Sequence, residues 1–482
     1  MKYSSENIAA ALFCPKRFRE ESLKKGQLLE SLSKQIDSDF GLETDSYRTA
    51  MTAPVRRLQQ KTQVFPLDVK ASSRSRLTHS LEAQTYARLI ALAIIRNCPE
   101  LFARFEHQIL LSVSTASVLH DIGNPPFGHF GEIVFRKWLS VITENSDIKS
   151  ELGSGEKEDL CSFNGNAQGL RLSHSIQQLN LTFGQYASFM KVPFTVSELL
   201  SGQGTGQSSN GVRSDYYSWA YRNAGVYLCE KCLVDKIREC RGTKNRHPFV
   251  SIVEWADDLS YVLADLEDAF ELGLIDRYDI LHMCDKMKQM HELDSMSDLL
   301  SHRTVADIFI HEPSEALFYL RDVVANAYIN DIAKATCSNI EQFIDQGEPD
   351  YSGGDYPGLT IVSMLHDYEK SKIYSCRDVE RLEISGGAFL DGLLSAYEKL
   401  LYEDTETFQK ELSGTGGDPL LKRLACRISR RHREAYIRAC TLRDQSEMYA
   451  RIRLILDYIS GMTDTYAQAE YAMISGAGVR SI

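Results

Sequence analysis

Hydrophobic residues recur at three- and four-residue steps along most of the chain, and this spacing is typical of helices. It is clear over residues 78–96 and 107–120. A third segment, 251–272, opens with Ser251, a residue type that often precedes a helix. Its expected buried stripe consists of Trp255, Leu259, Val262 and Leu266. Alternating strand patterns are scarce, so we predict an all-α, mainly helical fold.

Several segments break this spacing and are predicted to be loops. GNPPFGH at 123–129 cannot lie inside a helix, because two prolines and two glycines interrupt it. The acidic, glycine-containing stretch 144–159 and the low-complexity run 201–211 are predicted surface loops. Residues 345–358 and 412–418 are further loops. No repeat or linker divides the chain, so we expect one mostly helical domain over 1–482.

Composition narrows the class of protein. The 482 residues are 43% hydrophobic, which is enough for a packed interior, and no run approaches the roughly 18 apolar residues of a membrane span. The N-terminus lacks the apolar stretch of a signal peptide. The 11 scattered cysteines argue against a disulfide framework, and the lone C-x-x-C at Cys229 and Cys232 lacks the second pair of a zinc site. We therefore expect a cytoplasmic protein with no membrane partner.

The formal net charge of −12 does not attract polyanions from a distance. A nucleotide or nucleic-acid partner would need a metal ion or local basic clusters. The most prominent cluster comprises Lys422, Arg423, Arg427, Arg430, Arg431 and Arg433. It is either a solvated helix face or a surface that reaches the phosphates of substrate or single-stranded DNA, and the sequence leaves both readings open.

The candidate chemistry begins at His120 and Asp121, where a predicted helix meets the GNPPFGH loop. Imidazole nitrogen and carboxylate oxygen are suitable ligands for a divalent metal ion. A His-Asp dipeptide is common, however, and by itself is often a helix-terminal histidine beside an acid. Its interpretation therefore depends on what lies around it.

Two other segments strengthen the case for a metal site. His79 opens a strongly periodic helix, and Arg76 precedes it by three residues. Asp257, Tyr261 and Asp265 fall at i, i+4 and i+8, so they share one helical stripe beside the apolar one. Each residue also has a plainer interpretation. Asp257 could be a solvated acid near the start of a helix, Arg76 could pair with an acid, and Tyr261 could lie in the core.

These residues lie within longer blocks that resemble one family. The order His79, His120-Asp121, Asp257 is similar to the H…HD…D pattern of the HD superfamily of phosphohydrolases. The blocks that resemble its bacterial deoxyguanosinetriphosphate triphosphohydrolases are RRLQQKTQVFP, RSRLTHS, HDIGNPPFGHFGE, FNGNAQGLR, AGVYLCE, WADDLSYVLADLED and DYISGMTDTYA. The dense part of the resemblance covers roughly residues 55–270, and a short block near 457–467 adds to it.

The resemblance implies an HD phosphohydrolase core within 55–275. It implies helical elaborations and oligomer contacts within 276–482. The implied reaction is the metal-dependent hydrolysis of dGTP at the α-phosphorus to deoxyguanosine and tripolyphosphate. His79, His120, Asp121 and Asp257 would ligate a divalent ion, Mg²⁺ or Mn²⁺, although other transition metals also suit such ligands.

The resemblance also implies roles for residues beside the metal. His129 and Glu132 would assist attack or protonation at the α-phosphate, and Arg76 would contact phosphate. Tyr261, Asp265 and Gln63 would hold the sugar; Asn166 is a further substrate-binding candidate. His129 bonded to a loop carbonyl, Glu132 as a helix first-turn acid and Asn166 as an ordinary loop residue are the plainer alternatives.

Some positions depart from the family pattern. Cys229 replaces a usual serine, Arg222 a usual lysine and Asn164 a usual acid, which bears on phosphate-tail contacts and base selectivity. Two alternatives therefore stay open: a phosphohydrolase of broad nucleotide specificity, and a nucleotide-sensing or single-strand-binding protein with a vestigial site. The family also implies a homo-oligomer, commonly a hexamer, and single-stranded DNA as a partner of some members.

Overall fold

The computed structural model describes residues 5–18, 38–63, 74–202, 222–290, 313–374 and 377–477. Within these ranges the chain forms helices joined by short connections. The only extended pairings among the described residues are two isolated bridges, Arg17 with Thr182 and Thr62 with Ser75. The prediction of an all-α fold is confirmed. None of the described helices combines the length and apolar character that crossing a membrane requires.

The helices up to residue 202 are α1 (Ser5–Phe13), α4 (Ser38–Ala50), α5 (Ala53–Arg57), η1 (Leu58–Gln60), α6 (Arg76–Asn97), α7 (Pro99–Phe102), η2 (Ala103–Phe105), α8 (Glu106–Leu119), α9 (Gly128–Ile142), α10 (Ser146–Glu151), α11 (Glu156–Cys161), α12 (Gly165–Arg171), η3 (Leu172–Ile176), α13 (Phe183–Ala187) and α14 (Val196–Leu200).

The helices after residue 222 are η4 (Leu228–Glu230), α16 (Lys231–Arg241), α17 (Pro248–Glu271), α18 (Arg277–Met290), α21 (Pro313–Ser338), α22 (Ile340–Gln346), α23 (Pro357–Lys372), α24 (Arg377–Glu398), η5 (Lys399–Leu401), α25 (Thr405–Ser413), α26 (Pro419–Arg427), α27 (Arg430–Leu442), α28 (Glu447–Ser460) and α29 (Asp464–Ile474).

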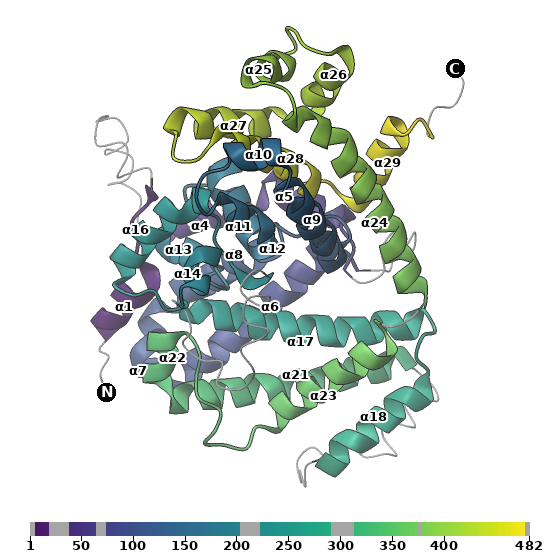
Figure 1. Ribbon diagram of the computed structural model, residues 1–482. Coiled ribbons are helices and arrows are strands. Elements are labelled where there is room, and N and C mark those ends of the chain that lie inside the picture. The colour runs from purple at the N-terminus through teal and green to yellow at the C-terminus, as the bar shows by residue number, and fades with distance from the viewer. Residues whose placement is uncertain are drawn as a thin grey trace.

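The centre of the molecule is built on α6, which packs against both α8 and α17. Figure 1 shows α17 running across the middle of the protein, with α21 and α23 below it. A capping box starts α6, because the Ser75 side chain accepts from the Thr78 N–H and the Thr78 side chain binds back. The start of α17 lies at Pro248, three residues before the predicted Ser251, and His247 caps it.

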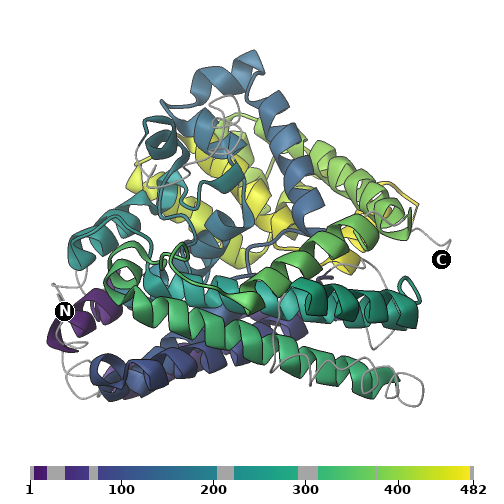
Figure 2. The same cartoon turned by 90° about the horizontal axis from the view of Figure 1, so that it is seen from below.

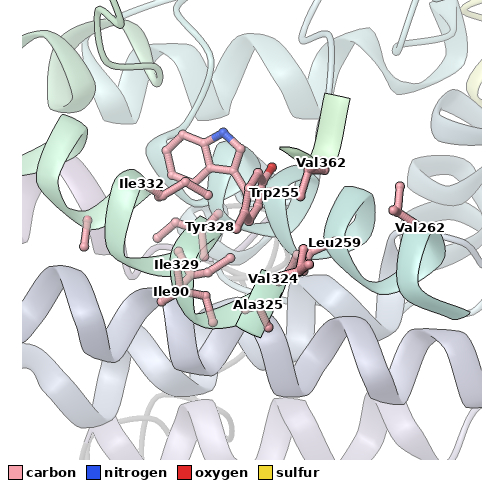
Figure 3. Close-up of a cluster of buried hydrophobic side chains, with 14 of the residues drawn as sticks. Ile90, Trp255, Leu259, Val262, Val324, Ala325, Tyr328, Ile329, Ile332 and Val362 are labelled. Carbon is pink, nitrogen blue, oxygen red and sulfur yellow. The ribbon is translucent and has the colours of Figure 1, made fainter. Parts of the chain in front are cut away.

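The predicted apolar stripe of α17 is buried and forms part of the main hydrophobic core. Figure 3 shows Trp255 and Leu259 facing the α21 residues Val324 and Tyr328. The Trp255 ring also stacks on Phe343, with 6.0 Å between ring centroids. This burial holds one side of α17 in place, so its polar stripe faces the opposite way.

A second hydrophobic core joins α9 to α24 and to the C-terminal helices α27 and α28. Phe135 of α9 and Leu390 of α24 are fully buried in it. In Figure 2 these blue, green and yellow segments gather in the upper part of the picture although they are distant in sequence. The helix that packs directly on α9 is α24, and α28 packs on α24 in turn.

The structure confirms three of the predicted loops and contradicts one. Residues 123–129 lie between α8 and the start of α9, and 345–358 and 412–418 contain the connections α22–α23 and α25–α26, so these predictions are confirmed. The prediction for 144–159 is wrong, because Asn145 caps α10 and an acidic first turn opens α11. Most of the run at 201–211 lies outside the described residues. Leu81 and Leu89 belong to the predicted helix α6 but are exposed.

The cysteines differ in part from expectation. Cys14 and Cys240 form a disulfide that joins the segment after α1 to α16, with 6.4 Å between their Cα atoms. Other described cysteines are free, including both members of the C-x-x-C. The Cys229 thiol lies 3.1 Å from Nη1 of Arg171, which agrees with a structural role for this cysteine.

A buried polar network lies between α11 and α28. The Asp159 carboxylate accepts from Arg453 at 2.6 Å, from the Tyr449 hydroxyl at 2.5 Å and from the Leu228 N–H at 2.8 Å. The Arg453 guanidinium also lies 3.5 Å from the centre of the Tyr227 ring. Both ionic side chains are almost completely shielded from solvent, so each depends on the other for its charge to be tolerated.

We therefore expect Asp159→Ala to destabilise the protein strongly, because it leaves the buried Arg453 charge without its carboxylate. The expected loss of unfolding free energy is about 3 to 5 kcal/mol, as for other broken buried ion pairs. Chemical denaturation followed by circular dichroism measures it. Glu144→Ala, at an exposed acid paired with Lys149, is the control and should change the unfolding free energy by no more than about 1 kcal/mol. Equal behaviour of the two variants would contradict this expectation.

Candidate active site

Three side chains from three central helices meet at one point. His79 lies on the first turn of α6, His120 directly follows α8, and Asp257 lies on α17. Their ligand atoms all lie within 4.8 Å of one another. The Asp257 Oδ1 is 2.8 Å from His79 Nε2 and 3.5 Å from His120 Nε2.

Both imidazoles are oriented by their other ring nitrogen. Nδ1 of His120 lies 2.6 Å from the Ser117 carbonyl, so it donates a proton there. Nδ1 of His79 lies 3.3 Å from Ser260 Oγ, whose hydroxyl donates to the Asp257 carbonyl. Nδ1 of His79 is therefore also the donor, and the Nε2 lone pairs of both rings point into the cluster. Metal-binding histidines are commonly held in this way.

The cluster fits a divalent cation. His120 Nε2 is buried without a hydrogen-bond partner, which is the observation that most directly calls for a ligand. Burial disfavours the charged imidazole, yet Asp121 and Asp257 raise the pKa of His120 to about 9. Burial likewise opposes ionisation of Asp257, yet His120 holds its pKa well below the usual range. A cation could replace the proton that these carboxylates attract.

Asp121 lies beside this cluster but is engaged elsewhere. Its Oδ2 accepts from Arg76 Nη1 at 2.9 Å, and its Oδ1 accepts from Asn124 Nδ2 at 2.5 Å. Asp121 Oδ1 is 3.5 Å from His120 Nε2. The described cluster thus has three ligands, and the role of Asp121 as a fourth stays a prediction.

Arg76 joins the cluster to the GNPPFGH loop. A Cβ at Gly128 would lie 2.7 Å from Arg76 Nη2, so the guanidinium lies directly against this glycine. Arg76 Nε is buried without a hydrogen-bond partner. The plainer reading pairs Arg76 with an acid such as Glu82 on the same helix, but Glu82 pairs instead with Arg74 at 3.1 Å. Arg76 therefore keeps a donor for another acceptor in the site.

His129 and Glu132 face each other on α9. His129 is exposed, and its Nδ1 lies 3.5 Å from Glu132 Oε2. Glu132 Oε1 accepts from the Gly165 N–H at 2.7 Å, and Arg136 lies 3.4 Å from Oε2. The hydrogen bond to Glu132 is the main cause that raises the pKa of His129 above its ordinary value. The pair thus presents a readily protonated imidazole to solvent.

The polar stripe of α17 ends against residues from α23 and just beyond it. The half-buried Tyr261 hydroxyl contacts Nδ1 of His366. The buried Asp265 accepts from the Tyr374 hydroxyl at 2.6 Å. Burial raises the pKa of Asp265 to about 7. Both candidate sugar-binding side chains are therefore fixed by partners more than 100 residues away.

The two remaining candidates lie on other elements. Gln63 is half-buried, and its Oε1 is shielded from solvent without a hydrogen-bond partner. Asn166 is half-buried at the start of α12, where its N–H donates to Asn164 Oδ1 at 2.7 Å. Asn164 thus caps α12 in place of the family's usual acid. It also places Gly165, the donor to Glu132.

Sequence reasoning missed several residues that shape the site. Asn124 lies inside the GNPPFGH motif, and Ser260 lies three residues after Asp257, so both could have been found by proximity. His366 and Tyr374 carry no such signal, because only the packing of α23 on α17 brings them to the site.

Several members of the C-terminal basic cluster have partners within the chain. Arg427 binds the buried Glu470 through Nε and Nη2. Arg430 pairs with Glu434 at 2.8 Å, and Arg431 contacts the Gln177 side chain. Arg427 therefore has a structural partner within the chain, and the two readings of the remaining cluster stay open.

The three-ligand cluster predicts the effect of removing its carboxylate. We expect Asp257→Asn to lower the affinity for Mn²⁺ by at least about 10- to 100-fold. Substitution of residues that only hydrogen-bond to a metal ligand already causes a loss of this size, and Asp257 is itself a candidate ligand. Isothermal titration calorimetry measures this affinity. Asp258→Asn is the matched control, since Asp258 is the adjacent, exposed carboxylate and lies outside the cluster. Equal Mn²⁺ affinity of the two variants would refute the assignment.

The contact between His129 and Glu132 predicts a pH effect. The carboxylate favours the imidazolium, so Glu132→Gln should lower the pKa of His129 toward about 6.5, its ordinary value. NMR titration of ¹³C-labelled histidines measures this pKa, with His129→Gln identifying the resonance. A hydrolytic activity that needs the protonated ring should lose its high-pH limb at lower pH in the same variant. An unchanged pKa would show that the two side chains do not interact in solution.

Comparisons with known proteins agree with this geometry. A family model described as "Phosphohydrolase-associated domain" matches residues 420–473. The chain is 31% identical to the deoxyguanosinetriphosphate triphosphohydrolase of Enterobacter sp. (strain 638), over 89% of this chain and 92% of that protein. It is 33% identical to the probable deoxyguanosinetriphosphate triphosphohydrolase of Pseudomonas aeruginosa, over 91% and 93%. The chain is a hydrolase and belongs to the deoxyguanosinetriphosphate triphosphohydrolase family of the HD superfamily.

Proposed function

We propose that the protein hydrolyses dGTP at the α-phosphorus and releases deoxyguanosine and intact tripolyphosphate, with a bound Mg²⁺ or Mn²⁺ ion. The observation that carries the proposal is the cluster of His79, His120 and Asp257, whose orphaned Nε2 calls for a cation. The names of the relatives supply the substrate. A cytoplasmic location is part of the same proposal, as expected from the sequence.

The charged groups of the site suit a triphosphate. An ion held by His79, His120 and Asp257 would neutralise phosphate charge and lower the pKa of a bound water. Arg76 offers the donor that its contact with Asp121 leaves unused, and guanidinium groups match phosphate oxygens. These groups provide local positive charge on a chain whose net charge is −12.

His129 would supply the proton that the leaving 5′-oxygen needs. Its bond to Glu132 raises the pKa of the imidazole, so a larger fraction is protonated at neutral pH. The Gly165 N–H and Arg136 hold Glu132 in place. The His129 ring is exposed at the N-terminus of α9, from where it would reach a substrate bound beside the metal.

The stripe of Tyr261 and Asp265 would select the sugar. A phenol ring packed near C2′ would clash with a ribose hydroxyl, which favours deoxynucleotides. Asp265 would accept a hydrogen bond from the 3′-OH, while Tyr374 fixes its other carboxyl oxygen. Because a hydroxyl has one proton to donate, Gln63 would complete this contact by donating from its amide nitrogen to the 3′ oxygen.

The proposal also includes the larger assembly that the family resemblance implies, a homo-oligomer of this chain. The members of the C-terminal basic cluster other than Arg427 would face a neighbouring subunit's substrate or single-stranded DNA. Native mass spectrometry tests the assembly, and strong salt dependence would mark DNA binding that relies on phosphate contacts.

The purified protein should convert dGTP with Mn²⁺ or Mg²⁺ to deoxyguanosine and tripolyphosphate in equal amounts. Ion-exchange chromatography or ³¹P NMR separates tripolyphosphate from pyrophosphate and orthophosphate. Release of orthophosphate or pyrophosphate as the first product would place the attack at another phosphorus and refute the proposed reaction. His120→Ala, which removes a ligand, is the inactive control.

The same assay with dATP, dCTP, dTTP and GTP tests selectivity. A preference for dGTP over the other deoxynucleotides is expected for this family. Similar rates on all four deoxynucleotides would favour the alternative of a broad nucleotide phosphohydrolase. Absence of turnover with an intact Mn²⁺ site would favour the nucleotide-sensing alternative.

A further inference from the structure

The C-terminal block DYISGMTDTYA has no part in the reaction described so far. Its Asp464 is the first residue of α29 and is buried, with 2% of its surface exposed. Asp464 Oδ1 accepts from the Phe127 N–H at 3.0 Å. Asp464 Oδ2 accepts from the Thr62 N–H at 3.0 Å and from the Thr62 hydroxyl. One carboxylate thus bridges two segments that are 65 residues apart and both lead into the site.

Each bridged segment ends in a candidate active-site residue. Phe127 lies two residues before His129 and precedes the first residue of α9. Its backbone has φ = 61°, a left-handed conformation that a non-glycine residue keeps only when its surroundings enforce it. Thr62 directly precedes Gln63. We call residues 127–129 the His129 arm and residues 62–63 the Gln63 arm. The bridge therefore connects the segment of the proposed proton donor with the segment of the proposed sugar contact.

A second contact joins the same segments to the C-terminal helices. Lys61 is buried, and its Nζ donates to the Asn124 carbonyl and, at 3.1 Å, to the Ser460 carbonyl at the end of α28. The Lys61 carbonyl accepts from the Arg76 N–H at 2.9 Å. Asn124 in turn bonds Asp121. The bridge is thus continuous with the backbone that holds the phosphate and metal side of the site.

We propose that Asp464 is a positioning residue that fixes the His129 arm and the Gln63 arm relative to each other. This inference rests on the proposed function, because it assigns those arms to proton transfer and sugar binding. The C-terminal segment then acts on the reaction without touching substrate. The competing explanation is that Asp464 only stabilises α29 as an acid at a helix N-terminus.

The bridge needs a carboxylate and not merely a polar side chain. Both Asp464 oxygens accept, and the N–H donors of Phe127 and Thr62 cannot reverse their role. Asparagine has one acceptor oxygen, and its amide nitrogen would face one of these N–H groups as a second donor. Asp464→Asn therefore keeps the shape of the side chain but can satisfy only one arm.

The test compares full-length wild-type protein and Asp464→Asn with dGTP and Mn²⁺. We expect kcat/KM to fall by about 10- to 100-fold, because small displacements of reacting groups carry such losses. Mn²⁺ affinity should stay unchanged, since no ligand of the cluster touches Asp464. Hydrogen–deuterium exchange should rise by at least about 10-fold at the Phe127 N–H or at the Thr62 N–H, because one of these two groups loses its acceptor.

Two further variants separate positioning from simple stability. Glu470→Gln removes the charge of a different buried carboxylate of α29. This carboxylate binds Arg427 and accepts from the Tyr397 hydroxyl. The substitution should lower the thermal midpoint yet leave kcat/KM of the folded protein and exchange at Phe127 and Thr62 unchanged. Thr62→Val removes one donor of the bridge, so it should raise KM for dGTP several-fold with little change in kcat.

The inference is overturned if Asp464→Asn has wild-type kinetics, or if it loses activity only in proportion to its unfolded fraction, as a purely stabilising residue would. If Asp464→Asn does not fold, Thr62→Val carries the test, and an unchanged KM overturns it. If the wild-type protein does not hydrolyse dGTP, the proposed function fails by itself. Local exchange at Phe127 and Thr62 still decides whether the bridge holds these two segments.

Discussion

The contact of His79 with Asp257, at 2.8 Å across the interface of α6 and α17, is the constraint around which the molecule is organised. Charged and polar groups of this kind are tolerated inside a protein only when they have partners. The site therefore requires that α6, α8 and α17 keep a fixed distance and rotation. The hydrophobic side of α17, with Trp255 and Leu259 fully packed, supplies that rigidity and turns the polar stripe toward the histidines.

The charges around this contact are arranged so that few are left alone. Asp121 binds Arg76, Glu132 binds His129, and Asp159 binds Arg453 at a distance from the site. Three buried atoms of the candidate site have no hydrogen-bond partner: Arg76 Nε, His120 Nε2 and Gln63 Oε1. Such atoms also occur elsewhere among the described residues, so the orphaned His120 Nε2 points to a ligand because His79 and Asp257 converge on it.

The part of the chain after α17 contributes to the site although it contains none of the three clustered candidate ligands. His366 and Tyr374 hold the side chains of Tyr261 and Asp265, and Asp464 reaches the loop before α9. The match of the phosphohydrolase-associated model to residues 420–473 includes α28 and α29. The C-terminal helices thus belong to the architecture of the site, because they fix the angles at which its residues meet.

The sequence determined the helical class and the three central helices, because the spacing of apolar residues and the GNPPFGH loop are local properties. The metal-ligand assignment from the sequence stays a prediction, which the meeting of His79, His120 and Asp257 supports. The sequence misjudged 144–159, where Asn145 and an acidic first turn start short helices within a polar stretch. It could not predict that Asp121 binds Arg76 and Asn124, or that Tyr374 and Asp464 reach the site. The contact of Asp121 with Asn124 is local, but the other contacts join residues that are 45 to 402 positions apart in the sequence. Only tertiary packing decides which of such distant side chains meet.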